Sequence, residues 1–197
     1  MDQLYWREYY YYLTTHFPKT LAGQILKGQG KNETFRREYL NLTWDDNEEW
    51  FQAWCNGRTG YQVVDAIMTQ LNTENWISNG GRMVVASFLC TDLYLDWTKG
   101  ERYFAEKLVD YDPALNNGGW QWSAGTGADG KFVAVGSLRI FNPWIQQKKF
   151  DKNGEFVKRM LPEYFADVPE EWIKDWENGS VRARARSRFR VRVRIRS

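Results

Sequence analysis

The stretch Asn116-Asn117-Gly118-Gly119-Trp120-Gln121-Trp122 carries the densest chemical information in the chain. Its two glycines allow a close backbone approach or a sharp turn. Its buried amides are costly unless they are hydrogen-bonded, and its indoles pack or stack on planar groups. Two interpretations stay open from these residues alone: a loop that core tryptophans hold in place, or a site for a specific polar partner.

Composition indicates one aromatic-rich domain. The 197 residues suffice for one domain with a real core, and 11 Trp, 11 Tyr and 11 Phe predict a packed helical body or an aromatic-lined pocket. Two distant cysteines, Cys55 and Cys90, provide no disulfide framework or metal cluster and favour a reducing cell interior. With His16 as the only histidine, we expect no metal site and no Ser-His triad.

Targeting patterns and charge add two expectations. The first residues lack the basic and then apolar run of a signal peptide, and no run of about 18 apolar residues predicts a membrane span. Eight of the 27 basic residues and no acid lie in 181–197, which leaves 19 basic against 25 acidic residues in 1–180, a net charge of −6. An anion-binding face on the body would therefore have to be local.

Hydrophobic periodicity predicts helices and few strands before residue 181. The first helix ends before Pro18 and the last before Pro162, and 62–73 has helical spacing of apolar residues. The expected helices cover 4–17, 48–54, 62–73, 82–91, 101–108 and 155–161. The expected loops and turns cover 21–34, 56–60, 76–81, 124–136 and 139–143.

Three charged residues suggest a site. Arg82 stands at the edge of an apolar helix and needs an acidic or phosphate partner. Asp110 and Asp112 are either turn or capping residues, or one pairs with Arg82 while the other reaches a ligand. Residues 151–154 resemble the start of an EF-hand, but the third oxygen ligand and the closing Glu are missing.

The tail 181–197 alternates Arg with mostly apolar residues. Its period suits a strand, but eight positive charges oppose a packed sheet. Three interpretations compete: disorder, a nucleic-acid-binding arm, or foreign sequence, and we favour the last because nothing upstream has this composition.

Five motifs occur in an order that resembles one family. They are 6–10 (WREYY), 57–66 (GRTGYQVVDA), 82–89 (RMVVASFL), 96–104 (DWTKGERYF) and 116–122 (NNGGWQW). From about residue 3 to about 176 the chain resembles the FAD-binding catalytic domain of the cryptochrome/photolyase family, nearest the cyclobutane pyrimidine dimer (class I) branch. The resemblance implies an all-α domain that binds FAD.

The resemblance also implies an organisation of the chain. We expect 1–180 to be the C-terminal catalytic domain, incomplete at its N-terminal side, and 181–197 to be a separate tail. The family's antenna domain, with its pigment, and the segment that holds the FAD pyrophosphate are absent from this sequence.

Site residues follow from the resemblance, position by position. Arg82 and Asp110 pair beside the flavin, Asp112 lies near its ring edge and ribose, and Asn116 faces N5. The implied FAD-binding set is Arg7, Asn79, Arg82, Asp110, Tyr111, Asp112 and Asn116. The implied DNA-binding set is Gln3, Trp6, Arg7, Asn79, Gly80, Met83 and Trp122. The implied electron relay, from flavin to surface, is Trp120, Trp97 and Trp54.

The implied activity is light-driven splitting of pyrimidine dimers, a carbon–carbon lyase reaction on DNA, by a monomer inside the cell, in the cytoplasm, nucleus or an organelle. Two residues depart from the pattern: Gln3 replaces a Glu that contacts the lesion, and Gly80 replaces an Arg. They keep two alternatives open, a cryptochrome-like light receptor that signals to protein partners, and an inactive truncated fragment.

Overall fold

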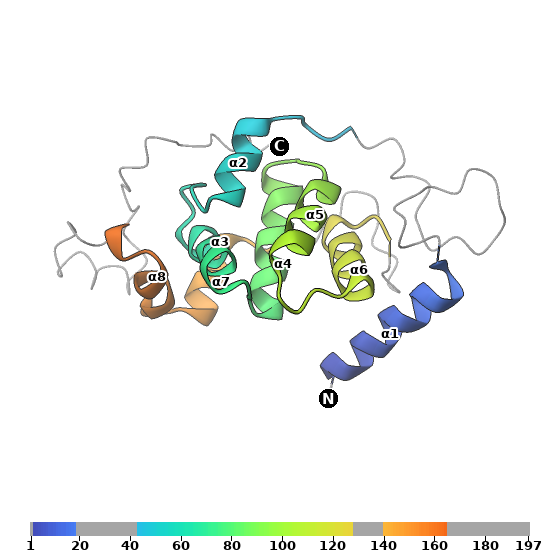
Figure 1. Ribbon diagram of the computed structural model, residues 1–197. Coiled ribbons are helices and arrows are strands. Elements are labelled where there is room, and N and C mark those ends of the chain that lie inside the picture. Colours follow the sequence, from blue (N-terminus) through green and yellow to red (C-terminus); the bar gives the residue numbers. More distant parts are fainter. Residues whose placement is uncertain (1, 19–42, 128–139, 165–197) are drawn as a thin grey trace.

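The structure is a computed structural model that describes residues 2–18, 43–127 and 140–164. In these ranges it is helical, with isolated β-bridge residues but no sheet, as Figure 1 shows. The predicted all-α class is therefore confirmed. No helix in these ranges is long and apolar enough to cross a membrane, and no cluster of three or more metal-ligating side chains occurs in them.

The described helices have the following chain order. They are α1 (Asp2–His16), α2 (Glu48–Cys55), α3 (Gln62–Glu74), α4 (Asn79–Ser87), the π-helical turn Phe88–Asp92, α5 (Trp97–Lys107), α6 (Pro113–Ala124), α7 (Pro143–Phe150), α8 (Glu155–Met160) and the 3-10 turn Pro162–Tyr164.

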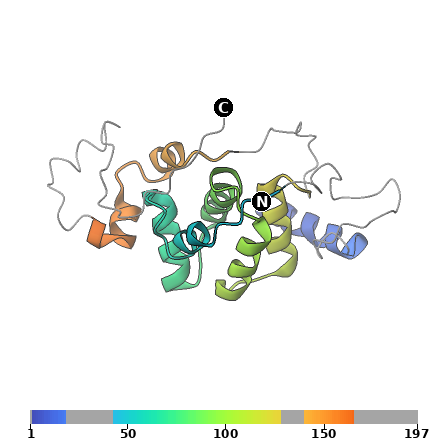
Figure 2. The ribbon, with the colours of Figure 1, turned by 90° about the horizontal axis from the view of Figure 1, so that it is seen from above.

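The core lies where α3, α4, α5 and α6 meet. Helix α4 packs against α3 and α6, and α5 packs along α6 (Figures 1 and 2). Trp54, Met68, Phe88 and Trp120 are among its largest fully buried side chains. Burying one such side chain stabilises a fold by about 1.5–3 kcal/mol. Because this packing holds the helices together, it also fixes the positions of the polar residues at their ends.

Polar caps set where several helices begin. Each cap accepts a hydrogen bond from a backbone N–H of the first turn, which would otherwise lack a partner. The capping residues are Asn47 for α2, Ser78 for α4, Asp96 for α5, Asp112 for α6 and Asn142 for α7.

The caps explain three differences from the prediction. Residues 79–81 were expected in a turn, but Ser78 caps α4 and places them in its first turn. The loop interpretation of 116–122 is wrong, because Asp112 and Pro113 start a helix that includes both glycines. Helix α7 is not among the expected helices, because the sequence pattern of 139–143 predicts a turn, whereas Asn142 caps a helix that begins at Pro143.

A glycine lets α5 and α6 approach closely. A Cβ on Gly100 would lie 2.2 Å from one ring carbon of Trp120 and 2.6 Å from Cδ2 of Leu89. Real Cβ atoms do not approach other atoms so closely, so the indole of Trp120 occupies the space that a side chain at 100 would need. The close packing of α5 on α6 therefore explains why a glycine stands at position 100 of the motif 96–104.

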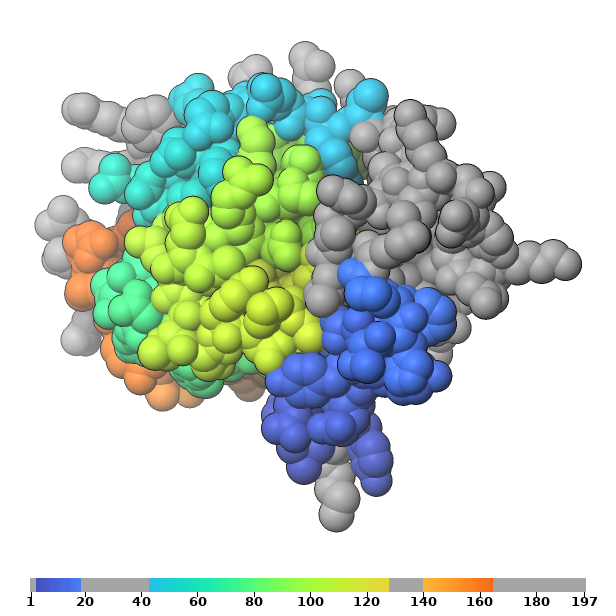
Figure 3. Space-filling view, turned by 45° about the vertical axis from the view of Figure 1, so that its right-hand side comes forward, coloured from blue at the N-terminus to red at the C-terminus, as the bar shows by residue number. Residues whose placement is uncertain are grey.

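Helix α1 projects from the body and packs against α6 (Figures 1 and 3). The ring of Tyr10 lies over Gly118, where a Cβ would be 2.2 Å from its Cδ1. One turn of α1 also carries the Tyr11 hydroxyl, which donates to Oδ2 of Asp112 at 2.5 Å. These two contacts place the polar residues of α1 beside the N-terminal half of α6.

Candidate functional site

The centre of the candidate site is an ion pair between α4 and the loop before α6. Nη2 of Arg82 donates to both carboxylate oxygens of Asp110, at 2.7 and 2.8 Å. Nε of Arg82 donates to the carbonyl of Ile77 at 3.1 Å, which fixes the guanidinium plane. This pairing was one of the two predicted alternatives and is confirmed.

The loop that carries Asp110 is anchored to α3. Asn75 ends α3 in the left-handed conformation, with φ 54°, and its carbonyl accepts from the N–H of Val109 at 2.9 Å. Asn tolerates this conformation better than most residues. This main-chain hydrogen bond fixes the backbone just before Asp110 and Asp112, and so helps to position both carboxylates.

Asp112 serves the fold in two ways. Its Oδ1 accepts from the N–H of Leu115 at 3.0 Å and caps α6, while Oδ2 accepts from the hydroxyl of Tyr11. That hydrogen bond raises the pKa of Tyr11 and keeps the phenol protonated. The capping interpretation of Asp112 is confirmed; its contact with a ligand stays a prediction.

Asn116 is oriented by α5. Its Nδ2 donates to the carbonyl of Glu101 at 3.0 Å, and its Oδ1 accepts no hydrogen bond from the described residues. The neighbouring Asn117 donates to Oε1 of Glu101 at 2.9 Å and accepts from Gln121 at 2.6 Å. Both amides thus join α6 to α5, and Asn116 in addition presents, at the half-buried edge of α6, a carbonyl oxygen that no described residue uses.

The predicted DNA-binding residues lie on α1, α4 and α6. Gln3, Trp6 and Arg7 are exposed on α1, where Arg7 pairs with Glu8 at 3.1 Å. Asn79 and Gly80 are exposed in the first turn of α4, and Nδ2 of Asn79 lies 3.6 Å from Sδ of Met83.

Trp6 and Trp122 do not form a ring pair in this structure. Trp6 is 48 % exposed and contacts Tyr9 edge-on at 5.6 Å between ring centroids, whereas Trp122 lies 6.1 Å from Phe141. Tyr111, from the predicted cofactor set, is also exposed, beside Asp110. These contacts do not test the expected DNA-binding role of Trp6 and Trp122, which stays a prediction.

Aromatic rings form a continuous cluster behind the site. The ring of Trp120 lies 6.1 Å from Trp54 and 5.0 Å from Phe104. Nε1 of Trp54 donates to the carbonyl of Val85 at 3.0 Å, whereas the buried Nε1 of Trp120 has no hydrogen-bond partner within the described part of the chain. An indole without an acceptor has no nearby base to take its proton.

The predicted relay ends in the wrong place. Trp54 is 0 % exposed, so it lies wholly inside the core and is not a surface end. Sequence reasoning had no means to see this, because 48–54 and 116–122 are far apart in the chain. Trp97 is also buried and lies on the face of α5 that Gly100, three residues later, presents to Trp120.

Sequence reasoning missed Trp44. Asp45 forms a parallel bridge with Leu95, and its N–H donates to the carbonyl of Tyr94 at 2.8 Å. This pairing brings Trp44 alongside the start of α5, and its half-buried side chain packs against the core. The signal available in the sequence was weak: a Trp that is followed by two acids, Asp45 and Asp46, is typical of a half-exposed position.

Comparisons with known proteins agree with this geometry. A family model described as the FAD binding domain of DNA photolyase matches residues 1–194, so the chain belongs to this family. A deoxyribodipyrimidine photo-lyase from Salmonella typhimurium is 44 % identical over 175 residues, covering 89 % of this chain and 34 % of that protein. The enzyme of this name from Vibrio cholerae is 47 % identical over 163 residues, covering 83 % and 32 %.

Solved structures show the same fold. An archaeal photolyase from Sulfolobus tokodaii, solved with two FAD molecules, has a TM-score of 0.72 and 44 % identity, with 92 % of this chain and 38 % of that chain covered. A cryptochrome from Synechocystis has a TM-score of 0.71 and 32 % identity, covering 87 % and 32 %. A class III photolyase from Agrobacterium tumefaciens has a TM-score of 0.73 and 38 % identity, covering 93 % and 34 %.

The comparisons define the family and its FAD-binding domain, and the chain spans about a third of the length of the curated relatives it matches. They support neither the assignment to the class I branch nor the placement of the domain at the C-terminal side of a longer protein. Both remain finer predictions. The match to residue 194 overlaps the arginine-rich tail, which lies outside the described residues.

Proposed function

We propose that this domain serves light-driven repair of cyclobutane pyrimidine dimers in DNA, with FAD as its cofactor. The single observation that carries the proposal is the Arg82–Asp110 ion pair in front of α6, the helix that also carries Asn116, whose Oδ1 accepts no hydrogen bond from the described residues. The names of the relatives, deoxyribodipyrimidine photo-lyase, support the reaction class.

The residues present fit FAD. An amide oxygen without a partner suits an N–H of a flavin ring, and a guanidinium that one carboxylate already neutralises adds little net charge beside a ring. Arg82, Asp110 and Asn116 would hold the ring, and Asp112, Tyr111, Arg7 and Asn79 would complete the pocket wall. When bound, FAD supplies light absorption and a transferable electron.

The lesion would be received by α1, α4 and α6. A pyrimidine dimer pairs poorly and leaves the duplex at small cost, and exposed aromatic faces can stack on it. Trp6 and Trp122 would provide those faces, Gln3 its polar edge, and Arg7, Asn79 and Met83 the contacts between cofactor and DNA. Gly80 would leave one backbone contact unmade.

Tryptophans would pass electrons to oxidised FAD and so reduce it. Trp120 would give one electron inward and receive one from Trp97, and an external thiol would supply the last electron at the surface. Because Nε1 of Trp120 has no hydrogen-bond acceptor in the described residues, its indole would keep its proton during this step. We propose Trp44 as the surface end, in place of Trp54, which would be a side branch within the core.

Repair and relay can be tested separately. The FAD-loaded protein, chemically reduced in the dark, should split thymine dimers in a short oligonucleotide under blue light. Trp120→Phe should slow photoreduction of oxidised FAD but leave repair by the reduced protein intact. A reduced, FAD-loaded protein that leaves every dimer unsplit would refute the repair function.

We further propose that the domain belongs to the class I branch and ends near residue 180. It would form the C-terminal part of a longer protein, which would act as a monomer inside the cell. A cryptochrome-like receptor is the second candidate, since Gln3 and Gly80 both reduce contacts to a lesion. Light-dependent binding of a protein partner without any repair would favour it.

A further inference from the structure

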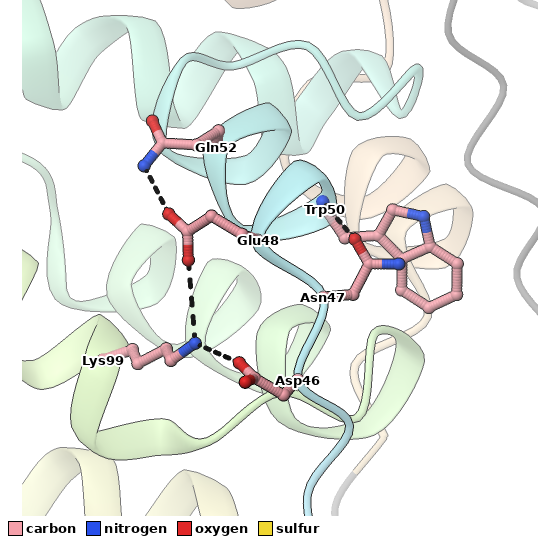
Figure 4. Close-up of polar contacts among 6 residues, drawn as sticks. All are labelled: Asp46, Asn47, Glu48, Trp50, Gln52 and Lys99. Carbon is pink, nitrogen blue, oxygen red and sulfur yellow. Dashed lines mark hydrogen bonds and ion pairs between the residues drawn. The ribbon is translucent and has the colours of Figure 1, made fainter.

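A charged clamp joins the segment 43–47 to the first turns of α5 and α2. Nζ of Lys99, on α5, lies 2.8 Å from Oδ1 of Asp46 and 3.7 Å from Oε2 of Glu48. Figure 4 shows the ammonium group between the two carboxylates. The same nitrogen lies 5.8 Å from the ring centroid of Phe51 on α2. The Lys99 side chain therefore interacts with two carboxylates and one aromatic ring.

The clamp is organised by helix α2 itself. Gln52 donates from Nε2 to the other carboxylate oxygen of Glu48 at 2.8 Å, which turns Oε2 toward Lys99 (Figure 4). Asn47 caps the helix by accepting from the N–H of Trp50 at 3.0 Å. The hydrogen bond to Asp46 raises the pKa of Lys99, and that to Lys99 lowers the pKa of Asp46, so both partners stay charged near neutral pH.

The segment has few other attachments. The described contacts that hold it are the main-chain hydrogen bond from Asp45 to Tyr94, the bridge to Leu95 and the packing of Trp44. Tyr94 lies in the left-handed region, with φ 55°, which is costly for a residue with a bulky side chain. A segment with one such hydrogen bond and exposed side chains belongs to the least stable part of a fold.

We propose that Lys99 is a positioning residue that keeps Trp44 docked beside the start of α5, and so controls the outer end of the electron relay. The effect on the electron relay rests on the proposed function, whereas the docking of Trp44 by Lys99 does not, because docking needs no cofactor. Electron transfer between rings depends steeply on their separation, and a detached segment would take Trp44 away from Trp97.

The direct test is hydrogen exchange of the Asp45 amide, which needs neither FAD nor light. Removing the charge while keeping the length of the side chain, with Lys99→Met, should accelerate exchange in 43–47 by about 1.4- to 5-fold, the range expected for exposed ion pairs. Lys99→Arg should restore slow exchange. The matched control is Arg102→Met, an exposed cation on the same helix, which should leave 43–47 unchanged.

Two further comparisons show that the effect runs through the pair. Lys99→Met combined with Asp46→Asn should exchange no faster than Lys99→Met alone. Raising the salt from about 0.05 to about 0.5 M should accelerate exchange in the wild type and not in Lys99→Met. Equal exchange in the wild type and Lys99→Met at low salt, or equal acceleration by Arg102→Met, would overturn the proposal.

The consequence for the relay is read in the FAD-loaded protein. Lys99→Met should slow the photoreduction of FAD, as Trp44→Phe should, and Lys99→Arg should restore the wild-type rate. Faster exchange with unchanged photoreduction would overturn the positioning role. Unchanged photoreduction in Trp44→Phe would instead remove Trp44 from the proposed function and leave the docking result standing.

Discussion

Gly100→Ala tests the close packing of α5 on α6. The added Cβ would meet the ring of Trp120 at 2.2 and 2.7 Å and Cδ2 of Leu89 at 2.6 Å. Trp120 and Leu89 are buried, at 2 % and 0 % exposure, so neither can move into solvent. Gly119→Ala is the matched control, because it also lies inside a helix and its Cβ would meet nothing within 4 Å.

The control isolates the clash from the general effect of alanine. Alanine is favoured over glycine in a helix interior by about 1 kcal/mol, and this gain applies to both variants. Overpacking a core costs about 1–3 kcal/mol, and applies only to Gly100→Ala. The two variants should therefore differ in unfolding free energy by about 1–3 kcal/mol, with Gly119→Ala at or above the wild type.

Urea unfolding followed by far-UV circular dichroism measures this difference, and the slopes should agree between variants. In a thermal scan the two midpoints should be separated by about 2–4 °C for each kcal/mol. If Gly100→Ala proved as stable as Gly119→Ala, the contact between α5 and the indole of Trp120 would not exist as described.

Three further outcomes are expected. Gly118→Ala should release α1, because its Cβ would lie 2.2 Å from the ring of Tyr10, and limited proteolysis should then cleave α1 first while the α3–α6 core stays intact. Burial raises the pKa of Asp65 from 3.8 to about 6, so its contribution to stability is present below about pH 4 and is lost as the pH rises through 6. Relative to Asp65→Asn, the unfolding free energy of the wild type should fall by about 3 kcal/mol between pH 4 and 7, and parallel urea curves that show no such change would contradict the burial. Gly80→Arg should fold normally, since nothing lies within 4 Å of its Cβ, and should tighten binding to DNA in a salt-dependent way, which a filter-binding titration would measure.

The helices could be predicted from local patterns, and the helix starts less well. Val63, Val64, Ile67, Met68 and Leu71 carry the period of α3, and the structure extends that helix by a single residue. The starts of α4 and α6 depend on Ser78 and Asp112, whose side chains bond to backbone N–H groups. A pair of adjacent glycines in each helix obscured the prediction: residues 80 and 81 in α4, and residues 118 and 119 in α6.

Contacts between distant segments could be predicted only in part. Arg82 and Asp110 were matched through the family resemblance, because the residues alone indicated only that an Arg at the edge of an apolar helix needs an acidic or phosphate partner. The positions of Trp54 and Trp44 were not predictable, because both depend on contacts with distant residues. Trp54 packs against Tyr103 and Phe104 of α5. Trp44 follows the bridge from Asp45 to Leu95, and a two-residue pairing has no periodic signal.

The Tyr11–Asp112 contact illustrates the same limit. Tyr11 stands in a run of four tyrosines, 9–12, that is too wide for one apolar stripe. Only the position of α1 on α6 shows that this hydroxyl, and not a neighbour's, reaches the capping carboxylate.

The most direct test of the proposed FAD site is the absorbance spectrum of the purified chain after FAD is added and free ligand is removed. We predict that flavin bands remain with the wild type and with Arg102→Met, and are lost when Arg82→Met and Asn116→Leu are combined. A chain without flavin, or a double variant that retains as much flavin as the wild type, would contradict the assignment of Arg82, Asp110 and Asn116 to the cofactor.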